Sequence, residues 1–176
     1  MTTGAVHRNG DTLFVGIDVG TVSDPTVCVT AERRADGRLW VVEVLILRGM
    51  DLSPQEEQLA PRIRRSVRAC GDATGLGRQM AQDFARDFGG KYEGCNFTPD
   101  FKREIFPRLK KIFQDRGVAI PISKDLREDC HAYQESFAGG QASYWAPRTK
   151  EGHSDICTAL ALMVKAATAE KDQGYF

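Results

Sequence analysis

The chain has 176 residues, 41% of them hydrophobic and 27% charged, which is ordinary for one globular domain with a real core. Its 24 basic and 24 acidic residues give a formal net charge of zero, which argues against a protein that holds nucleic acid by overall charge. No apolar run approaches the roughly 20 residues that cross a bilayer, so no membrane partner is expected, and the N-terminus lacks the features of a secretion signal.

The first third of the chain predicts three strands, at residues 13–18, 26–32 and 39–47. Apolar and β-branched residues dominate these segments, and a turn of the Asp-Gly type at Asp36-Gly37 separates the second from the third. The connections are short, so an antiparallel meander is expected.

Helices and strands then alternate. Ser53-Pro54-Gln55-Glu56 carries the cap, the proline and the Glu of a capping box, and Pro107 predicts a kink or two abutting pieces in a later helix. The predicted helices cover residues 53–66, 76–88, 99–116, 124–138 and 155–170, and short extended segments cover 69–72, 92–97, 118–122 and 142–146.

This order predicts an α/β fold, with a mixed sheet that begins as a three-strand antiparallel meander, continues with parallel strands and has helices on both faces. We expect one domain over residues 12–170, a flexible tail or linker remnant at 1–11 and a C-terminal tail at 171–176. The five cysteines have no zinc-knuckle spacing, and buried free thiols are expected.

Three aspartates stand at the edges of regular elements. Asp18 ends an apolar strand within Gly-Ile-Asp-Val-Gly, where the glycines allow another group to approach the backbone closely. Asp72 follows a short strand and precedes a Gly-rich loop, and Asp155 opens an apolar, buried helix. Such carboxylates can meet at one corner of a sheet, where their repulsion favours a bound cation, and oxygen ligands suit Mg²⁺ or Mn²⁺.

Each aspartate also has a purely structural explanation. Asp18 could cap a turn, Asp72 could form an Asx-turn, and Asp155 would be favoured by the helix dipole in any case. His153 is a further candidate as a metal ligand, a proton shuttle or a phosphate contact, although a lone histidine in a loop more often has none of these roles.

The basic residues fall in clusters. Those on predicted helices, including Arg62–Arg68 and Lys102–Lys111, have acidic neighbours and are interpreted as solvated faces. Arg148 and Lys150 lie in the loop before Asp155 and are the best-placed candidates for contact with a phosphate backbone.

Four motifs in this order resemble the nuclease domain of a tailed-bacteriophage terminase large subunit, over residues 12–170. They are Gly16-Ile17-Asp18-Val19-Gly20 with the following Asp24-Pro25-Thr26-Val27, Gly71-Asp72-Ala73-Thr74-Gly75-Leu76-Gly77, Asp125-Leu126-Arg127-Glu128-Asp129, and Gly152-His153-Ser154-Asp155 before an Ala/Leu-rich helix.

The resemblance implies a ribonuclease H-like fold and a metal-dependent endonuclease that cleaves double-stranded concatemeric viral DNA during genome packaging. It makes Asp18, Asp72 and Asp155 the catalytic, metal-binding triad, with two Mg²⁺ or Mn²⁺ ions bound alongside the substrate. It also implies an ATPase motor domain, a portal and a small terminase subunit as partners, in the cytoplasm of the infected bacterial host. The sequence has no Walker A motif, so the motor is not in this chain.

Three alternatives stay open. The domain could be a non-catalytic module that docks on DNA or on the portal, its acids serving structure alone. Asp18-Val19-Gly20-Thr21 also resembles the first phosphate loop of actin-like ATP-binding phosphotransferases, of which this chain would be a fragment. A junction resolvase of related fold is the third possibility.

Overall fold

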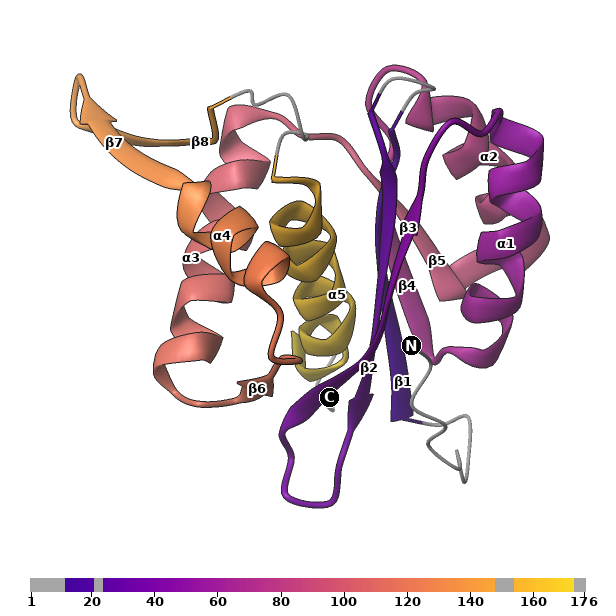
Figure 1. The fold of residues 1–176 in the computed structure, drawn as a ribbon, viewed down its shortest axis with the longest axis horizontal. Coiled ribbons are helices and arrows are strands. Elements are labelled where there is room, and N and C mark those ends of the chain that lie inside the picture. The colour runs from indigo at the N-terminus through magenta and orange to yellow at the C-terminus, as the bar shows by residue number, and fades with distance from the viewer. Residues whose placement is uncertain (1–11, 21–23, 148–153, 173–176) are drawn as a thin grey trace.

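The computed structural model describes residues 12–20, 24–147 and 154–172. A six-stranded sheet with the order β5-β4-β1-β2-β3-β6 forms the centre of the molecule (Figure 1). Its strands are β1 (Leu13–Asp18), β2 (Thr26–Arg33), β3 (Leu39–Leu47), β4 (Arg68–Asp72), β5 (Tyr92–Cys95) and β6 (Val118–Ala119).

The predicted meander is confirmed, because β1 pairs with β2 and β2 with β3 in antiparallel register. Strands β4 and β5 extend the sheet beyond β1 in parallel, and β6 runs parallel to β3 at the other edge. Strand β1 therefore lies inside the sheet, between β4 and β2, and the carboxyl ends of β1 and β4 come side by side.

Helices cover both faces of the sheet, as the sequence predicts. Helices α1 (Leu52–Arg65) and α2 (Gly77–Phe88) pack on one face, and α5 (Asp155–Asp172) packs directly on the other, with α3 (Pro99–Gln114) and α4 (Lys124–Ala132) outside it (Figure 1). A short 3-10 turn, η2 (Gly89–Lys91), leads from α2 into β5.

Successive side chains of β1 point to opposite faces of the sheet, and each face has its own cluster of core residues. Phe14 packs on the α5 side among buried residues of that helix, whereas Val15 and Ile17 pack on the other side against α1 and α2. Residues Ala159 to Val164 of α5 are at most 1% exposed, because the helix lies between the sheet and the outer helices. This explains why α5 is apolar almost all round.

Gly16 is the point of closest approach between β1 and α5. A Cβ added there would lie 2.0 Å from the carbonyl oxygen of Ala159 and 2.2 Å from the amide nitrogen of Met163. Backbone therefore packs on backbone at this crossing, as expected of a glycine inside a strand.

Two helix predictions need correction. The predicted helix at 124–138 ends at Ala132, and residues 134–138 form β7 (Gln134–Ala138), which pairs with β8 (Gln141–Trp145). The two-residue turn between them is Gly139-Gly140, with φ values of 59° and 79° that suit a tight hairpin. Helix α3 runs unbroken through Pro107 rather than as two pieces.

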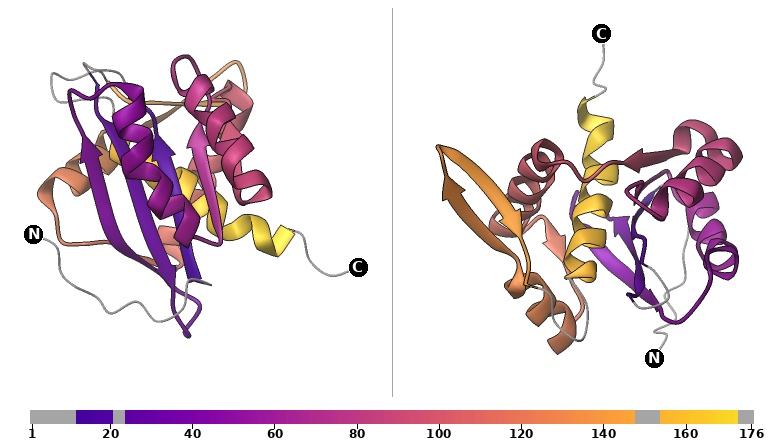
Figure 2. Two further views of the ribbon diagram at one scale, coloured as in Figure 1. Left: turned by 90° about the vertical axis from the view of Figure 1, so that its right-hand side faces the viewer. Right: turned by 90° about the horizontal axis from the view of Figure 1, so that it is seen from above.

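The hairpin of β7 and β8 lies at the edge of the molecule, on the outer side of α3 (Figure 2). Tyr133, just before β7, stacks on Phe106 of α3 with ring centroids 3.9 Å apart, and Tyr144 of β8 stacks on the same ring at 5.9 Å. These aromatic contacts join the hairpin to α3.

Smaller predictions have mixed outcomes. Helix α1 begins at Leu52 with Asp51 in the cap position, so the predicted capping box at Ser53 is wrong. All five cysteines are free, four of them buried and Cys130 half-buried, as expected. Within the described residues, no helix is long and apolar enough to cross a membrane.

Candidate active site

The three aspartates singled out from the sequence line one cavity of about 420 Å³. Asp18 and Asp72 are the last residues of the neighbouring parallel strands β1 and β4, and Asp155 is the first residue of α5, which packs on β1. The cavity thus lies at the carboxyl ends of parallel strands, where open α/β sheets usually place their ligand sites. Its other lining residues are Thr74, Phe97, Lys102, Tyr133, Trp145, Ala146 and Thr158.

The surroundings of Asp18 disfavour the ionised form of its carboxyl group. Desolvation of its carboxyl raises its pKa well above the usual value, and the negative charges of Asp155, Asp72 and Asp129 raise it further. A hydrogen bond with the Thr158 side chain acts in the opposite direction. The cavity therefore favours a proton on Asp18 unless another positive charge takes its place.

Asp72 lines the cavity and also accepts a hydrogen bond that closes a local backbone turn. Its Oδ1 accepts a hydrogen bond from the backbone N–H of Thr74 at 2.7 Å, which is the Asx-turn foreseen as an alternative. Desolvation raises its pKa, whereas the bonds from Thr74 and the charge of Lys102 lower it. The turn uses one carboxylate oxygen and holds the side chain at the edge of the cavity.

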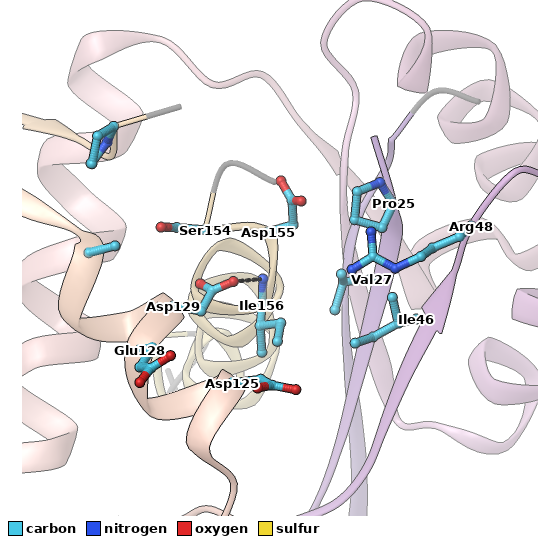
Figure 3. Close-up of a pocket in the computed structure, with 12 residues that line it drawn as sticks. Pro25, Val27, Ile46, Arg48, Asp125, Glu128, Asp129, Ser154, Asp155 and Ile156 are labelled. Carbon is cyan, nitrogen blue, oxygen red and sulfur yellow. Dashed lines mark hydrogen bonds between the residues drawn. The ribbon is translucent and has the colours of Figure 1, made fainter. Parts of the chain in front are cut away.

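The first turn of α5, which carries Asp155, donates hydrogen bonds to a side chain of another helix. Asp129 of α4 accepts hydrogen bonds from the backbone N–H groups of Ile156 at 3.2 Å and Cys157 at 3.0 Å. Ser154, just before Asp155, has a φ of 64°, which is rare for a residue other than glycine. Figure 3 shows Asp129 beside the first turn, with Asp155 pointing away from it.

Lys102 brings a positive charge to the cavity. It stands in the first turn of α3, whose start is capped by the side-chain oxygen of Thr98, which accepts the N–H of Phe101 at 3.2 Å. Lys102 is half-buried and lowers the pKa of Asp72, so its interpretation as part of a solvated helix face is wrong. In the sequence, Thr98-Pro99 indicates where the helix begins, but no pattern in the sequence predicts that the first turn of this helix lies beside Asp72.

A second cavity, of about 520 Å³, lies beside the start of α5 (Figure 3). Its walls are α4 with the start of α5 on one side and the strands β2 and β3 on the other. Acidic side chains of α4 face Arg48, Val27 and Ile46 across it. Asp155 lines both cavities.

The donor set suits a hard divalent cation, because carboxylate oxygens are the ligands that Mg²⁺ and Mn²⁺ prefer. Among the described residues, however, no three His, Cys, Asp or Glu side chains are close enough together to hold an ion as they stand. The three aspartates share one cavity, and the charges of Asp72 and Asp155 act on Asp18 across it, so an ion held by all three would require their side chains to turn inward. His153, Arg148 and Lys150 lie outside the described residues.

Comparison with known proteins gives one family. The family model described as the terminase RNaseH-like domain matches residues 15–166. No curated protein matches the chain in sequence.

Solved structures give the same answer for the fold. The large terminase nuclease of thermophilic phage G20c with bound magnesium is similar with a TM-score of 0.75 and 20% identity, over 90% of this chain and 83% of that one. The nuclease domain of the bacteriophage SPP1 large terminase with bound Mn has a TM-score of 0.57 and 14% identity, covering 92% and 87%. The HK97 bacteriophage large terminase has a TM-score of 0.61 and 15% identity, covering 88% of this chain and 39% of that chain. These likenesses confirm the predicted ribonuclease H-like fold.

Proposed function

The chain belongs to the family of terminase RNaseH-like domains, and from that premise we propose that it is a divalent-metal-dependent endonuclease that cleaves double-stranded concatemeric viral DNA during genome packaging. The observation that carries the proposal is the meeting of Asp18, Asp72 and Asp155 at one cavity. The G20c and SPP1 nucleases, whose structures contain magnesium and Mn, support a metal-dependent reaction by their similarity.

In this proposal, the three aspartates hold two Mg²⁺ or Mn²⁺ ions together with the DNA. Asp18, inside the sheet, would hold the ions together with Asp72 and Asp155, and His153 is a further candidate ligand. The bound ions supply a more acidic attacking water and stabilise the charge that develops on the leaving 3′-oxygen.

The protein's own side chains prepare the site for this chemistry. Desolvation and mutual repulsion of the carboxylates favour a positive charge at their centre, so a divalent ion competes with the proton on Asp18. Lys102, in the first turn of α3, is placed to attract a DNA phosphate into the cavity, since the start of a helix also favours anions. Arg148 and Lys150 are proposed as further DNA contacts.

The proposed nuclease domain covers residues 12–170. Its proposed partners are double-stranded DNA, an ATPase motor domain, the portal and the small terminase subunit, in the cytoplasm of the infected bacterium. The sequence contains no Walker A motif, so a separate domain or chain would supply ATP hydrolysis.

A plasmid-nicking assay tests the proposal. The wild-type chain is expected to nick supercoiled plasmid with Mn²⁺ or Mg²⁺ and to lose this activity in EDTA. Asp18→Asn should abolish nicking and keep the far-UV circular dichroism spectrum, because it removes a carboxylate without changing the side-chain shape. Asp36→Asn, an exposed acid in the turn between β2 and β3, is the matched control and should nick normally. Retained cleavage in purified Asp18→Asn protein would refute the assignment.

A non-catalytic docking module is the alternative to the nuclease. That alternative predicts DNA or portal binding without nicking at any Mn²⁺ concentration, so the same assay separates the two. The family match lends no support to the actin-like phosphotransferase alternative.

A further inference from the structure

The start of α5 is capped in an unusual way. In most helices, the residue just before the helix accepts hydrogen bonds from the N–H groups of the second or third helical residue. Here those groups belong to Ile156 and Cys157, and both donate to the carboxylate of Asp129, which lies 27 and 28 residues earlier on α4. The cap therefore comes from a neighbouring helix.

Asp129 faces α5 because of its place on α4. Leu126, three residues earlier and on the same face, is 3% exposed and belongs to the core cluster around α5. Asp129 itself is half-buried, and its two oxygens each accept one backbone N–H. A carboxylate fits this arrangement, since an amide side chain has a single acceptor oxygen and would leave one of the two donors without its partner.

A second observation points to the same place. Ser154 has a left-handed backbone conformation, with a φ of 64°, which residues with a side chain rarely adopt and which persists only where the surroundings hold it. Asp155 stands between this strained residue and the two N–H groups that Asp129 holds. The position of the Asp155 carboxylate thus depends on the backbone conformation of Ser154 before it and on the hydrogen bonds to Asp129 after it.

We infer that Asp129 is a positioning residue for the metal site: by capping α5 from α4, it fixes the place of Asp155 in the cavity that Asp155 shares with Asp18 and Asp72. The inference rests on the proposed nuclease function. Asp129 also adds a negative charge near the triad, so its effect on metal binding has two parts, an attraction for the cation and the geometric effect of the cap. The experiment has to separate them.

Asp129→Asn and Glu128→Gln form the matched pair. Each removes one negative charge from α4 at the second cavity. Within the described residues, however, Glu128 makes no hydrogen bond to the start of α5 and instead pairs with Lys124 at 3.7 Å. Binding of Mn²⁺ is measured from the loss of the electron paramagnetic resonance signal of the free ion, and the Mn²⁺ requirement of plasmid nicking is measured separately. Hydrogen exchange at the amides of Ile156 and Cys157 reports the cap directly.

Asp129→Asn is expected to weaken Mn²⁺ binding and to raise the half-saturating Mn²⁺ concentration for nicking by about tenfold or more, as for partners that orient metal ligands. Exchange at Ile156 and Cys157 should become faster, whereas Glu128→Gln should change each measurement little. If Asp129→Asn is only marginally stable, the rise in melting temperature that Mn²⁺ causes gives the same comparison. This rise should be smaller in the variant than in the wild type.

An unchanged Mn²⁺ requirement in folded Asp129→Asn protein would overturn the inference, and an equal shift in both variants would reduce it to an effect of charge. The outcome for the proposed function is separate. If the wild type binds Mn²⁺ but never nicks DNA, the nuclease proposal fails while the binding and exchange measurements still decide on Asp129. A wild type that binds no Mn²⁺ overturns both.

Discussion

Asp18 combines desolvation with the repulsion of three neighbouring carboxylates, and both effects favour its protonated form. The folded protein therefore binds this proton more tightly than the unfolded chain does. The contribution of Asp18 to stability is full below the ordinary pKa of 3.8 and is lost as the pH rises through the higher pKa of the folded state. At neutral pH without metal, an ionised Asp18 thus opposes folding.

Asp18→Asn should consequently stabilise the metal-free protein while it removes activity. Asparagine carries no charge, so the melting temperature in EDTA should exceed that of the wild type at pH 8, by about 2–4 °C for each kcal/mol gained. The difference should shrink as the pH falls through the raised pKa of the folded state, and it should be smallest below 3.8, where Asp18 becomes protonated in the unfolded chain as well. Differential scanning fluorimetry across this range measures it, and a difference that does not change with pH would contradict the explanation.

Lys102 gives a second prediction at this scale. Lys102→Ala should raise the KM for a DNA duplex with a smaller effect on kcat, because the lysine attracts the phosphate backbone while the aspartates do the chemistry. Lys111→Ala is the control, since Lys111 lies near the far end of α3 and pairs with Asp115 at 2.9 Å. Steady-state nicking kinetics compare the two, and an equal change in both would argue against a DNA contact at Lys102.

The residues that could be predicted from the sequence are those with a local signature. Asp18, Asp72 and Asp155 each sit where an apolar segment begins or ends, and this pattern is visible without a structure. Asp129 ends one of the four motifs that carry the resemblance, but neither it nor Lys102 stands at such a boundary, and their positions depend on how separate helices pack. Asp129 meets its hydrogen-bond partners 27 and 28 residues away, so its role follows from the packing of α4 against α5.

At the scale of elements, the crossing of β1 and α5 fixes the geometry of the site. Gly16 lies two residues before Asp18 on β1, and its neighbours on α5, Ala159 and Met163, follow Asp155 within two turns or so. The strand and the helix that carry two of the three aspartates are thus in contact through their backbones. No side chain separates them at this point.

Gly16→Ala should therefore destabilise the protein strongly. The added methyl group would lie 2.0 Å and 2.2 Å from backbone atoms of α5, well inside van der Waals contact, and backbone cannot yield as a flexible side chain does. We expect a loss of about 3 kcal/mol or more in the free energy of unfolding, at the upper end for overpacked cores. Urea denaturation measures this loss, with Gly90→Ala as the control because a Cβ there meets nothing within 4 Å. Equal stability of the two variants would show that α5 is free to move away from β1.

Some helices and strands have a clear hydrophobic pattern in the sequence, and others do not. The strands of the meander are long, β-branched and buried, so their bounds could be read closely from the sequence. Residues 134–138 form a short, mostly polar segment, and the sequence pattern predicts them as part of the preceding helix. The structure makes them β7, because two glycines with positive φ close a hairpin on β8 and because Tyr133 and Tyr144 stack on Phe106. The turn signal was present, but the stacking that supports the hairpin comes from α3.

At the scale of the whole molecule, the equal numbers of acidic and basic residues are accompanied by many local ion pairs. Many basic side chains of the described surface are close to carboxylates, as in the pairs Arg62–Glu43, Arg68–Glu93, Arg103–Asp100, Lys110–Glu135 and Lys111–Asp115. Such pairs leave little charge for a DNA backbone. We therefore expect DNA binding to depend on a few contacts near the cavity.

The salt dependence of DNA binding tests this expectation. For the isolated chain, log K should fall with log salt with a slope of about −2 to −3, corresponding to two or three phosphate contacts rather than six or more. Fluorescence anisotropy with a labelled duplex in EDTA measures it without cleavage. A slope near −6 or steeper would mean that a broad basic surface binds the DNA.

The backbone contact at Gly16 also bears on how such a domain can change over evolutionary time. Because the peptide chain itself spaces β1 from α5, substitutions that alter the volume of other interior side chains need not alter the separation of Asp18 from Asp155. Most of the hydrophobic interior can then drift while the reactive corner keeps its dimensions. A glycine two positions before the first acid, more than overall resemblance, is what lineages of this fold would have to retain.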